Sequence, residues 1–199
     1  MAASERTFRR SVQPSGRQIP ATLSPGFHGF ATGVLTRGVW VYRKRHDDLR
    51  HEIELVVALK AGGANLTIEQ ALACVFGYAV GVDLTRRDLQ AAAKAKGQPW
   101  EAAKGFDQSA PISAIRVTEA PAAEAAVTLS VNGQARQHGL VGDMIWNIGE
   151  VIAKASELWT LAAGDLIFTG TPEGVAAIVR GDKIVGEIEG VGRLDFTLA

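Results

Sequence analysis

The sequence predicts an α+β fold with a mixed or antiparallel β-core, and three observations support this class. Apolar runs of strand length, separated by glycine turns, dominate residues 49–199. Helix-forming stretches are few and short. Asn132-Gly133 stands between two strand-like runs, Val127–Val131 and Gln134–Gln137, which is a strong signal for an antiparallel hairpin. Strands therefore form most of the core, and helices are minor additions.

Composition places the chain among ordinary globular proteins. Its 199 residues suffice for one domain with a sizeable core. The 21 basic and 21 acidic residues cancel, which argues against nucleic acid or an anionic membrane and favours a small-molecule partner. Cys74 is the only cysteine, which predicts a packed thiol in a protein of the reducing cytoplasm. No apolar run approaches the roughly 20 residues of a membrane-spanning helix.

The first 48 residues contain seven arginines and three prolines, and only Val39–Tyr42 shows any periodicity. We expect coil there. The predicted organisation is a poorly structured or divergent N-terminal segment at residues 1–48, followed by a folded domain at residues 49–199.

The stretch Arg50–Leu59, RHEIELVVAL, predicts a largely buried strand. Because strand side chains alternate between faces, Glu52 and Glu54 point the same way. Buried ionised acids are costly unless a cation or hydrogen-bond donors meet them, and Mg²⁺ takes carboxylate oxygens. The pair therefore indicates a metal site, with a solvated strand edge as the alternative. His51 should face away from Glu52, at the surface or an edge.

Three helices are predicted, and two of them carry no candidate site residue. Thr67 with Gln70 three residues later is a capping-box signal for a short helix. Residues 148–159 carry a single apolar stripe, which predicts a helix that packs on the core through Ile148, Val151, Ile152, Ala155 and Trp159.

A polar cluster is predicted where a strand-like run from Phe76 ends in Asp83. The helix-forming stretch Arg86–Lys96 follows and stops at Gly97-Gln98-Pro99. Arg87 and Gln90 stand four and seven residues after Asp83, a spacing that brings helical side chains to one face.

Two further stretches are ambiguous when taken alone. Thr169–Val175, TGTPEGV, is either a tight turn or a loop whose backbone N–H groups and Thr171 hydroxyl hold an anion. Lys104, in AAKGFD, reads as a surface lysine.

Together these stretches resemble one family, the fumarylacetoacetate hydrolases. H-E-x-E-L-x-V, G-Y-x-x-x-x-D-x-[ST]-x-R-D-x-Q, A-K-[GS]-F-D, D-M-I-[FW] and G-D-x-I-x-T-G-T-P-x-G-V follow one another in the family's order between residues 49 and 199. Within the family, GVDLTRRDLQ, QPWEAAKGFDQSAPIS and GDLIFTGTPEGV look most similar to bacterial fumarylpyruvate hydrolases and related acylpyruvases.

The resemblance implies a β-rich roll or sandwich with short helices, a homodimer, and Mg²⁺ or Mn²⁺ held at Glu52, Glu54 and Asp83. It implies metal-dependent hydrolysis of a C–C bond in an acylpyruvate such as fumarylpyruvate, in aromatic-compound catabolism. An oxaloacetate decarboxylase and a metal-binding but catalytically impaired member remain alternatives. The resemblance also implies that Lys104 and Gln90 are catalytic. It implies substrate-binding roles for Arg87, Gln90 and Thr171.

One departure concerns the water-activating base. Family members normally carry an N-Y-x-x-H segment upstream of the metal strand, whose histidine activates the water under a short lid. Nothing before Glu52 matches that segment. The sequence therefore predicts a more open site and slower hydrolysis than in lid-bearing relatives.

Overall fold

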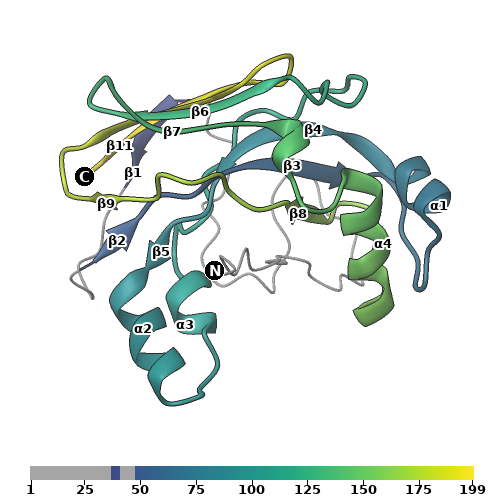
Figure 1. Cartoon of the computed structure of the whole chain (residues 1–199), viewed down its shortest axis with the longest axis horizontal. Helices are drawn as coiled ribbons and strands as arrows, with labels where there is room; N and C mark the ends of the chain where they lie inside the picture. Colours follow the sequence, from purple (N-terminus) through teal and green to yellow (C-terminus); the bar gives the residue numbers. More distant parts are fainter. Residues whose placement is uncertain (1–36, 41–47) are drawn as a thin grey trace.

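A computed structural model describes residues 37–40 and 48–199. Its main feature is a five-stranded sheet stacked over a three-stranded sheet, with a further small sheet at one end (Figure 1). The five-stranded sheet has the order β1-β11-β10-β6-β7. Its strands are β1 (Arg37–Trp40), β6 (Ala126–Val131), β7 (Gln134–Leu140), β10 (Lys183–Ile188) and β11 (Gly192–Leu198).

The second sheet, β4-β3-β8, carries the stretch that the sequence singled out. It is antiparallel throughout and comprises β3 (Ile53–Leu59), β4 (Val75–Val82) and β8 (Leu166–Phe168). The small third sheet, β5-β2-β9, comprises β2 (Leu49–Arg50), β5 (Thr85–Arg86) and β9 (Ala177–Ile178). The expected α+β class with a mixed β-core is confirmed, because β1 pairs with β11 in parallel while the other pairs in this sheet are antiparallel.

The predicted hairpin is present as β6 and β7. Asn132 and Gly133 both have positive φ, 52° and 78°, which suits the two-residue turn that matches strand twist.

The core lies between the two larger sheets. In β6, buried and half-buried residues alternate, as expected of a strand with one face on the core. All seven residues of β3 are buried. Its odd-numbered side chains, such as Ile53 and Leu55, join the main core, whereas Val56 packs on the other face with Phe168 and Ile112.

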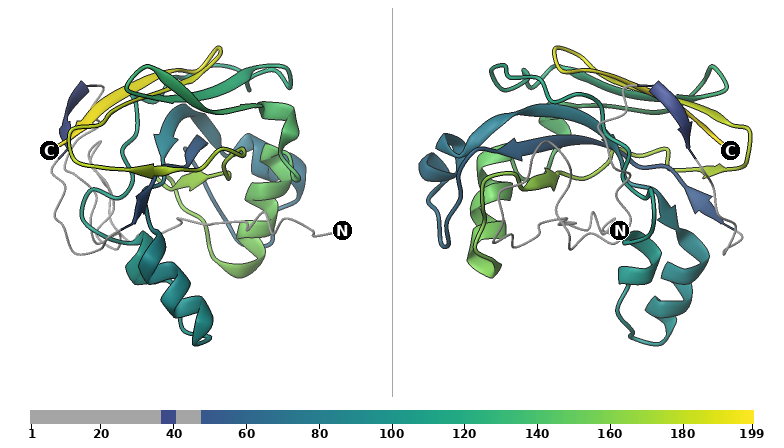
Figure 2. Two further views of the ribbon diagram at one scale, coloured as in Figure 1. Left: turned by 60° about the vertical axis from the view of Figure 1, so that its left-hand side comes forward. Right: turned by 180° about the vertical axis from the view of Figure 1, so that it is seen from behind.

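Four short α-helices complete the described residues, in two groups at opposite ends of the sheets (Figures 1 and 2). They are α1 (Ile68–Ala73), α2 (Arg87–Ala95), α3 (Glu101–Lys104) and α4 (Ile148–Leu158), and a 3₁₀ turn spans Val141–Asp143. The capping box of Thr67 and Gln70 begins α1 as predicted. No helix among the described residues is long and apolar enough to span a bilayer.

The stripe predicted for α4 is correct except at its end. Ile148, Val151, Ile152 and Ala155 are buried, but α4 ends at Leu158 and Trp159 is 39% exposed. Trp159 has φ −147° and ψ 147°, so the chain leaves the helix before the indole can join the stripe.

Residues 37–40 differ from the expected N-terminal coil. They form β1, whose backbone pairs with β11 from Arg37 opposite Asp195 to Trp40 opposite Leu198. A strand at the edge of a sheet gains backbone hydrogen bonds even where its sequence shows little periodicity. The rest of the predicted segment, residues 1–36 and 41–47, lies outside the described residues.

Candidate metal and substrate site

Three acidic side chains converge where β3 begins and β4 ends. Glu52 lies in the two-residue break between β2 and β3, Glu54 lies in β3, and Asp83 directly follows β4. The antiparallel pairing of Ile53 with Val82 sets these positions side by side, and the Asp83 N–H donates to the Glu52 carbonyl at 2.8 Å. One carboxylate oxygen from each residue lies within 4.8 Å of the others.

Lys104, at the end of α3, reaches this cluster. Its Nζ lies 2.9 Å from Glu52 Oε2 and 2.7 Å from Asp83 Oδ2, and it also contacts the Thr85 hydroxyl. The surface placement considered for Lys104 alone is therefore wrong, since its side chain is 18% exposed.

A contact from the neighbouring strand holds α3 in place. The Arg86 guanidinium stacks 3.9 Å from the centre of the Phe106 ring, and its Nη1 donates to the Ala102 carbonyl at 3.4 Å. Because Arg86 follows Thr85 in β5, this clamp aligns Lys104 with both the hydroxyl and the acids.

Arg87 and Gln90, the first and fourth residues of α2, meet the same cluster. Arg87 Nη2 lies 2.8 Å from Glu52 Oε1, and Arg87 Nη1 donates to Gln90 Oε1 at 2.5 Å. Gln90 is 3% exposed, and its Nε2 is buried without a hydrogen-bond partner among the described residues. Gln90 is thus linked to the acids through Arg87, and its buried amide donor suits an oxygen acceptor on a bound molecule.

The loop after β8 approaches Glu54 from the other side. The Gly170 N–H donates to Glu54 Oε2 at 2.7 Å, and both the N–H and hydroxyl of Thr169 donate to the Leu55 carbonyl. The loop Thr169–Val175 therefore places one backbone N–H, that of Gly170, on the Glu54 carboxylate. Binding of a separate anion by its backbone N–H groups and the Thr171 hydroxyl stays a prediction. Thr171 follows directly and is partly buried.

The cluster suits a hard divalent cation. All three side chains offer oxygen, the ligand type of Mg²⁺ and Mn²⁺. Glu52 and Glu54 are 4% and 1% exposed, so the solvated-edge alternative is wrong. Three negative charges face the two positive charges of Arg87 and Lys104, and the five groups together keep one negative charge that attracts a cation.

His51 differs from its predicted place at the surface. It is fully buried, and its Nδ1 lies 2.8 Å from Gln137 Oε1. Burial lowers the pKa of His51, and the hydrogen bond with Gln137 opposes this effect. The error arose because the opposite face of this strand is covered by β7, a contact between residues 86 apart in the sequence.

Sequence reasoning also missed Thr85 and Gln137, two buried polar residues that contact candidate site residues. Thr85 stands between Asp83 and Arg87 in the motif, and its burial beside Lys104 could have been suspected from that position. Gln137 was assigned only to a hairpin strand, and nothing local signals its burial.

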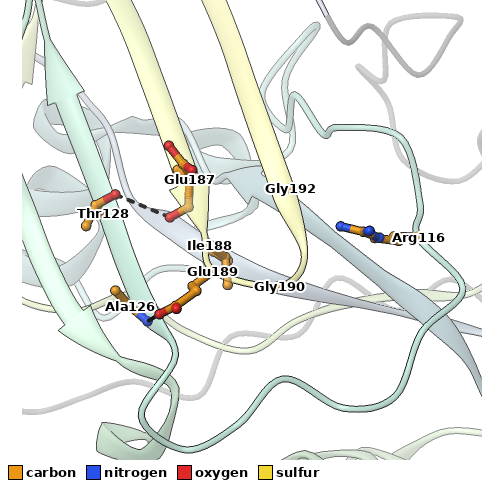
Figure 3. Close-up of a pocket in the computed structure, with 8 residues that line it drawn as sticks. All are labelled: Arg116, Ala126, Thr128, Glu187, Ile188, Glu189, Gly190 and Gly192. Atoms are coloured by element: carbon orange, nitrogen blue, oxygen red, sulfur yellow. Dashed lines mark hydrogen bonds between the residues drawn. The ribbon is translucent and has the colours of Figure 1, made fainter.

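A pocket beside the turn from β10 to β11 is lined by residues of the five-stranded sheet and by Arg116 (Figure 3). Glu189 accepts from the Ala126 N–H at its rim, and Thr128 donates to the Glu187 carbonyl. It shares no residue with the acidic cluster and offers no convergent set of side-chain donors, so the cluster is the stronger candidate site.

Comparison with known proteins shows which family the chain belongs to. The model of the fumarylacetoacetate hydrolase C-terminal domain matches residues 2–199. A fumarylpyruvate hydrolase of a Ralstonia species is 42% identical over 187 residues, which cover 92% of this chain and 97% of that protein. The chain belongs to the fumarylacetoacetate hydrolase family. The match begins well before residue 49, where the sequence motifs begin.

A solved structure and a further sequence relative also resemble the chain. The structure of a fumarylpyruvate hydrolase from Pseudomonas aeruginosa, in complex with Mn²⁺ and pyruvate, has a TM-score of 0.78 and 39% identity, over 82% of this chain and 75% of that one. The oxaloacetate tautomerase YcgM of Escherichia coli is 42% identical over 149 residues, 71% of this chain and 66% of that protein. The expected family and fold are thereby confirmed.

Proposed function

We propose that this protein is a metal-dependent hydrolase that cleaves a C–C bond in an acylpyruvate such as fumarylpyruvate, giving fumarate and pyruvate. The observation that carries the proposal is the Lys104 ammonium held between Glu52 and Asp83 at the edge of a three-carboxylate cluster. The likeness to a fumarylpyruvate hydrolase over nearly the whole chain supports the same substrate class.

The substrate matches this set of charges. An acylpyruvate is a 1,3-dicarbonyl compound with a carboxylate, so its oxygen atoms are acceptors for cations and N–H donors. Water adds to the distal carbonyl carbon, the bond from that carbon to the methylene breaks, and its electron pair becomes the pyruvate enolate. The carbon of the enolate then takes a proton to give pyruvate. The step that needs most help is formation of the enolate anion.

Each site residue has a part in this scheme. Glu52, Glu54 and Asp83 would hold Mg²⁺ or Mn²⁺, which when bound polarises carbonyl oxygens. The positive charge of the Lys104 ammonium, held by Glu52, Asp83 and Thr85, stabilises the developing enolate oxygen. Gln90 Nε2 donates to the carbonyl that water attacks, or to its oxyanion. Arg87 and Thr171 orient the substrate through its oxygen atoms.

Oxaloacetate is the second candidate substrate, since similar proteins are named oxaloacetate tautomerases. Decarboxylation of oxaloacetate also passes through the pyruvate enolate, and it needs no activated water. The Lys104 arrangement would serve this reaction without any base from residues 1–48.

The test uses the purified full-length protein with Mn²⁺ and two substrates. Loss of fumarylpyruvate absorbance with release of fumarate is the expected result. Release of pyruvate from oxaloacetate, without fumarylpyruvate hydrolysis, would replace the proposed function by decarboxylation, and loss of enol absorbance without pyruvate would replace it by tautomerisation. Silence in all assays with Mn²⁺ still bound would identify an impaired family member.

We propose further that the protein acts as a cytoplasmic homodimer in the breakdown of aromatic compounds. The single buried cysteine, Cys74, suits a reducing compartment. Sedimentation equilibrium distinguishes a dimer from the 21.1 kDa monomer.

A further inference from the structure

Gln137 connects three segments that are distant in the sequence. It lies in β7 and is 2% exposed. Its Oε1 accepts from the Ile53 N–H at 3.1 Å and faces His51 Nδ1 at 2.8 Å. Its Nε2 donates to Thr171 Oγ1 at 2.8 Å and to the Pro172 carbonyl at 2.9 Å. The side chain thus joins the start of β3 to the loop that contacts Glu54.

Two of these contacts fix which way the amide faces. A backbone N–H can only donate and a backbone carbonyl can only accept. Ile53 therefore requires the amide oxygen on its side, and Pro172 requires the amide nitrogen on the other. Reversing the amide would set donor against donor and acceptor against acceptor.

The fixed amide also determines the role of the Thr171 hydroxyl. Because Gln137 Nε2 donates to Oγ1, the hydroxyl proton points elsewhere and remains available as a donor. Thr171 follows Gly170, whose N–H contacts the candidate ligand Glu54. A donor in this position suits a carboxylate or carbonyl oxygen of the substrate.

The loop has little freedom to move away from Gln137. Gly174 has φ +96°, and a Cβ there would lie 2.0 Å from the Arg136 carbonyl oxygen. A Cβ on Gly139 would lie 2.8 Å from the Pro172 side chain. The loop therefore packs closely on β7 on both sides of Gln137.

We propose that Gln137 is a positioning residue that holds the Thr171 hydroxyl as a donor for the distal carboxylate of a dicarboxylic acylpyruvate. The inference rests on the proposed function and narrows it, because it favours fumarylpyruvate over acetylpyruvate, whose distal end is a methyl group.

The test compares Gln137→Glu and Thr171→Val on both substrates. Glutamate keeps acceptors for Ile53 and His51 but cannot donate to Thr171. We expect KM for fumarylpyruvate to rise about 10- to 100-fold in each variant, as for a lost hydrogen bond to a charged group. KM for acetylpyruvate should change less than about 3-fold, since no hydrogen bond to a carboxylate is lost there.

A double mutant separates positioning from a structural role. In the Thr171→Val background, Gln137→Glu should add less than about 2-fold to KM for fumarylpyruvate, because the hydroxyl it positions is gone. Gln134→Glu, at an exposed position of the same strand, is the matched control and should leave both KM values unchanged. Calorimetry with Mn²⁺ checks that each variant retains its acidic cluster.

Equal increases in KM for both substrates, or additive effects in the double mutant, would overturn the inference. If Gln137→Glu does not fold, an unchanged KM for fumarylpyruvate in Thr171→Val alone would overturn it. If the wild type hydrolyses neither substrate, the proposed function fails, and fumarate titrated into the Mn²⁺-loaded protein becomes the readout. Weaker fumarate binding in both variants then supports the inference, whereas no binding by the wild type or equal binding by all refutes it.

Discussion

Strand β3 and the strands of the five-stranded sheet differ in how far they bury their acidic residues. In β6 and β10 one face is buried and the other is partly or fully exposed, and the acids there, such as Glu187, lie at the surface. In β3 both faces are buried, and Glu54 is only 1% exposed. The difference shows that an acidic residue in a strand indicates a functional site when both faces of that strand are buried, and not when one face is exposed to solvent.

The largest effect should come from removing the positive charge of Lys104, which lies against the buried acids of the site. Lys104→Gln is expected to lower kcat on the order of 100- to 1,000-fold, because a preorganised charge for the enolate is lost. Binding of Mn²⁺ should persist, since the cluster becomes more negative. Steady-state kinetics and calorimetry measure the two quantities. Lys154→Gln, which removes an exposed partner of Glu157, is the control and should change neither.

Glu54→Gln compares the two kinds of acid directly. Loss of a candidate ligand should weaken Mn²⁺ binding by more than about 100-fold, beyond what changes to residues behind metal ligands usually cause. Glu187→Gln, on the outer face of the five-stranded sheet, should leave the affinity unchanged. Calorimetry on both variants is the measurement, and equal affinities would remove Glu54 from the metal site.

Glycine substitutions compare packing in the two layers. A Cβ on Gly81 would lie 2.5 Å from Val56 Cγ2 and 2.6 Å from Phe168 Cε1, so Gly81→Ala should cost about 1 to 3 kcal/mol of stability. A Cβ on Gly186 would lie 3.0 Å from Ile53 Cδ1, at the far end of that side chain, and 3.5 Å from Val80 Cγ1. Gly186→Ala should therefore cost less in urea unfolding, and the reverse order would contradict the described packing of β4 on β3.

The smallest effect concerns Tyr78, in β4. Burial raises the pKa of Tyr78 above its ordinary value of 10.0. The unfolded chain then ionises first, so the stabilising contribution is complete below pH 10 and is lost as the pH rises through the folded pKa. Urea unfolding at about pH 9 and about pH 11 should show a smaller loss of stability in Tyr78→Phe than in the wild type. Equal losses would mean that the phenol ionises alike in both states.

Local signals in the sequence predicted much of this structure. The capping box, the Asn132-Gly133 turn and the spacing of Glu52 and Glu54 each depend on residues a few positions apart, and each has the expected geometry. The expectation that Lys104 belongs to the site, however, came from the family resemblance and not from the periodicity of the sequence.

The features that were missed depend on contacts between distant strands. His51 is buried because Gln137 covers it, and β1 exists because β11 provides a partner. Neither contact leaves a pattern within its own segment. The prediction that Trp159 packs on the core was wrong for the opposite reason, because the local periodicity continues one residue beyond the end of α4.

The pairing of β1 with β11 has a consequence for synthesis of the protein on the ribosome. Arg37 and Asp195 are opposite each other but are translated 158 residues apart, 195 minus 37. At about 5 to 20 residues per second, the first strand waits roughly 10 to 30 s for its partner. This edge of the sheet can therefore form only after β11 has been translated, and truncation before β11 would leave β1 without the strand it pairs with.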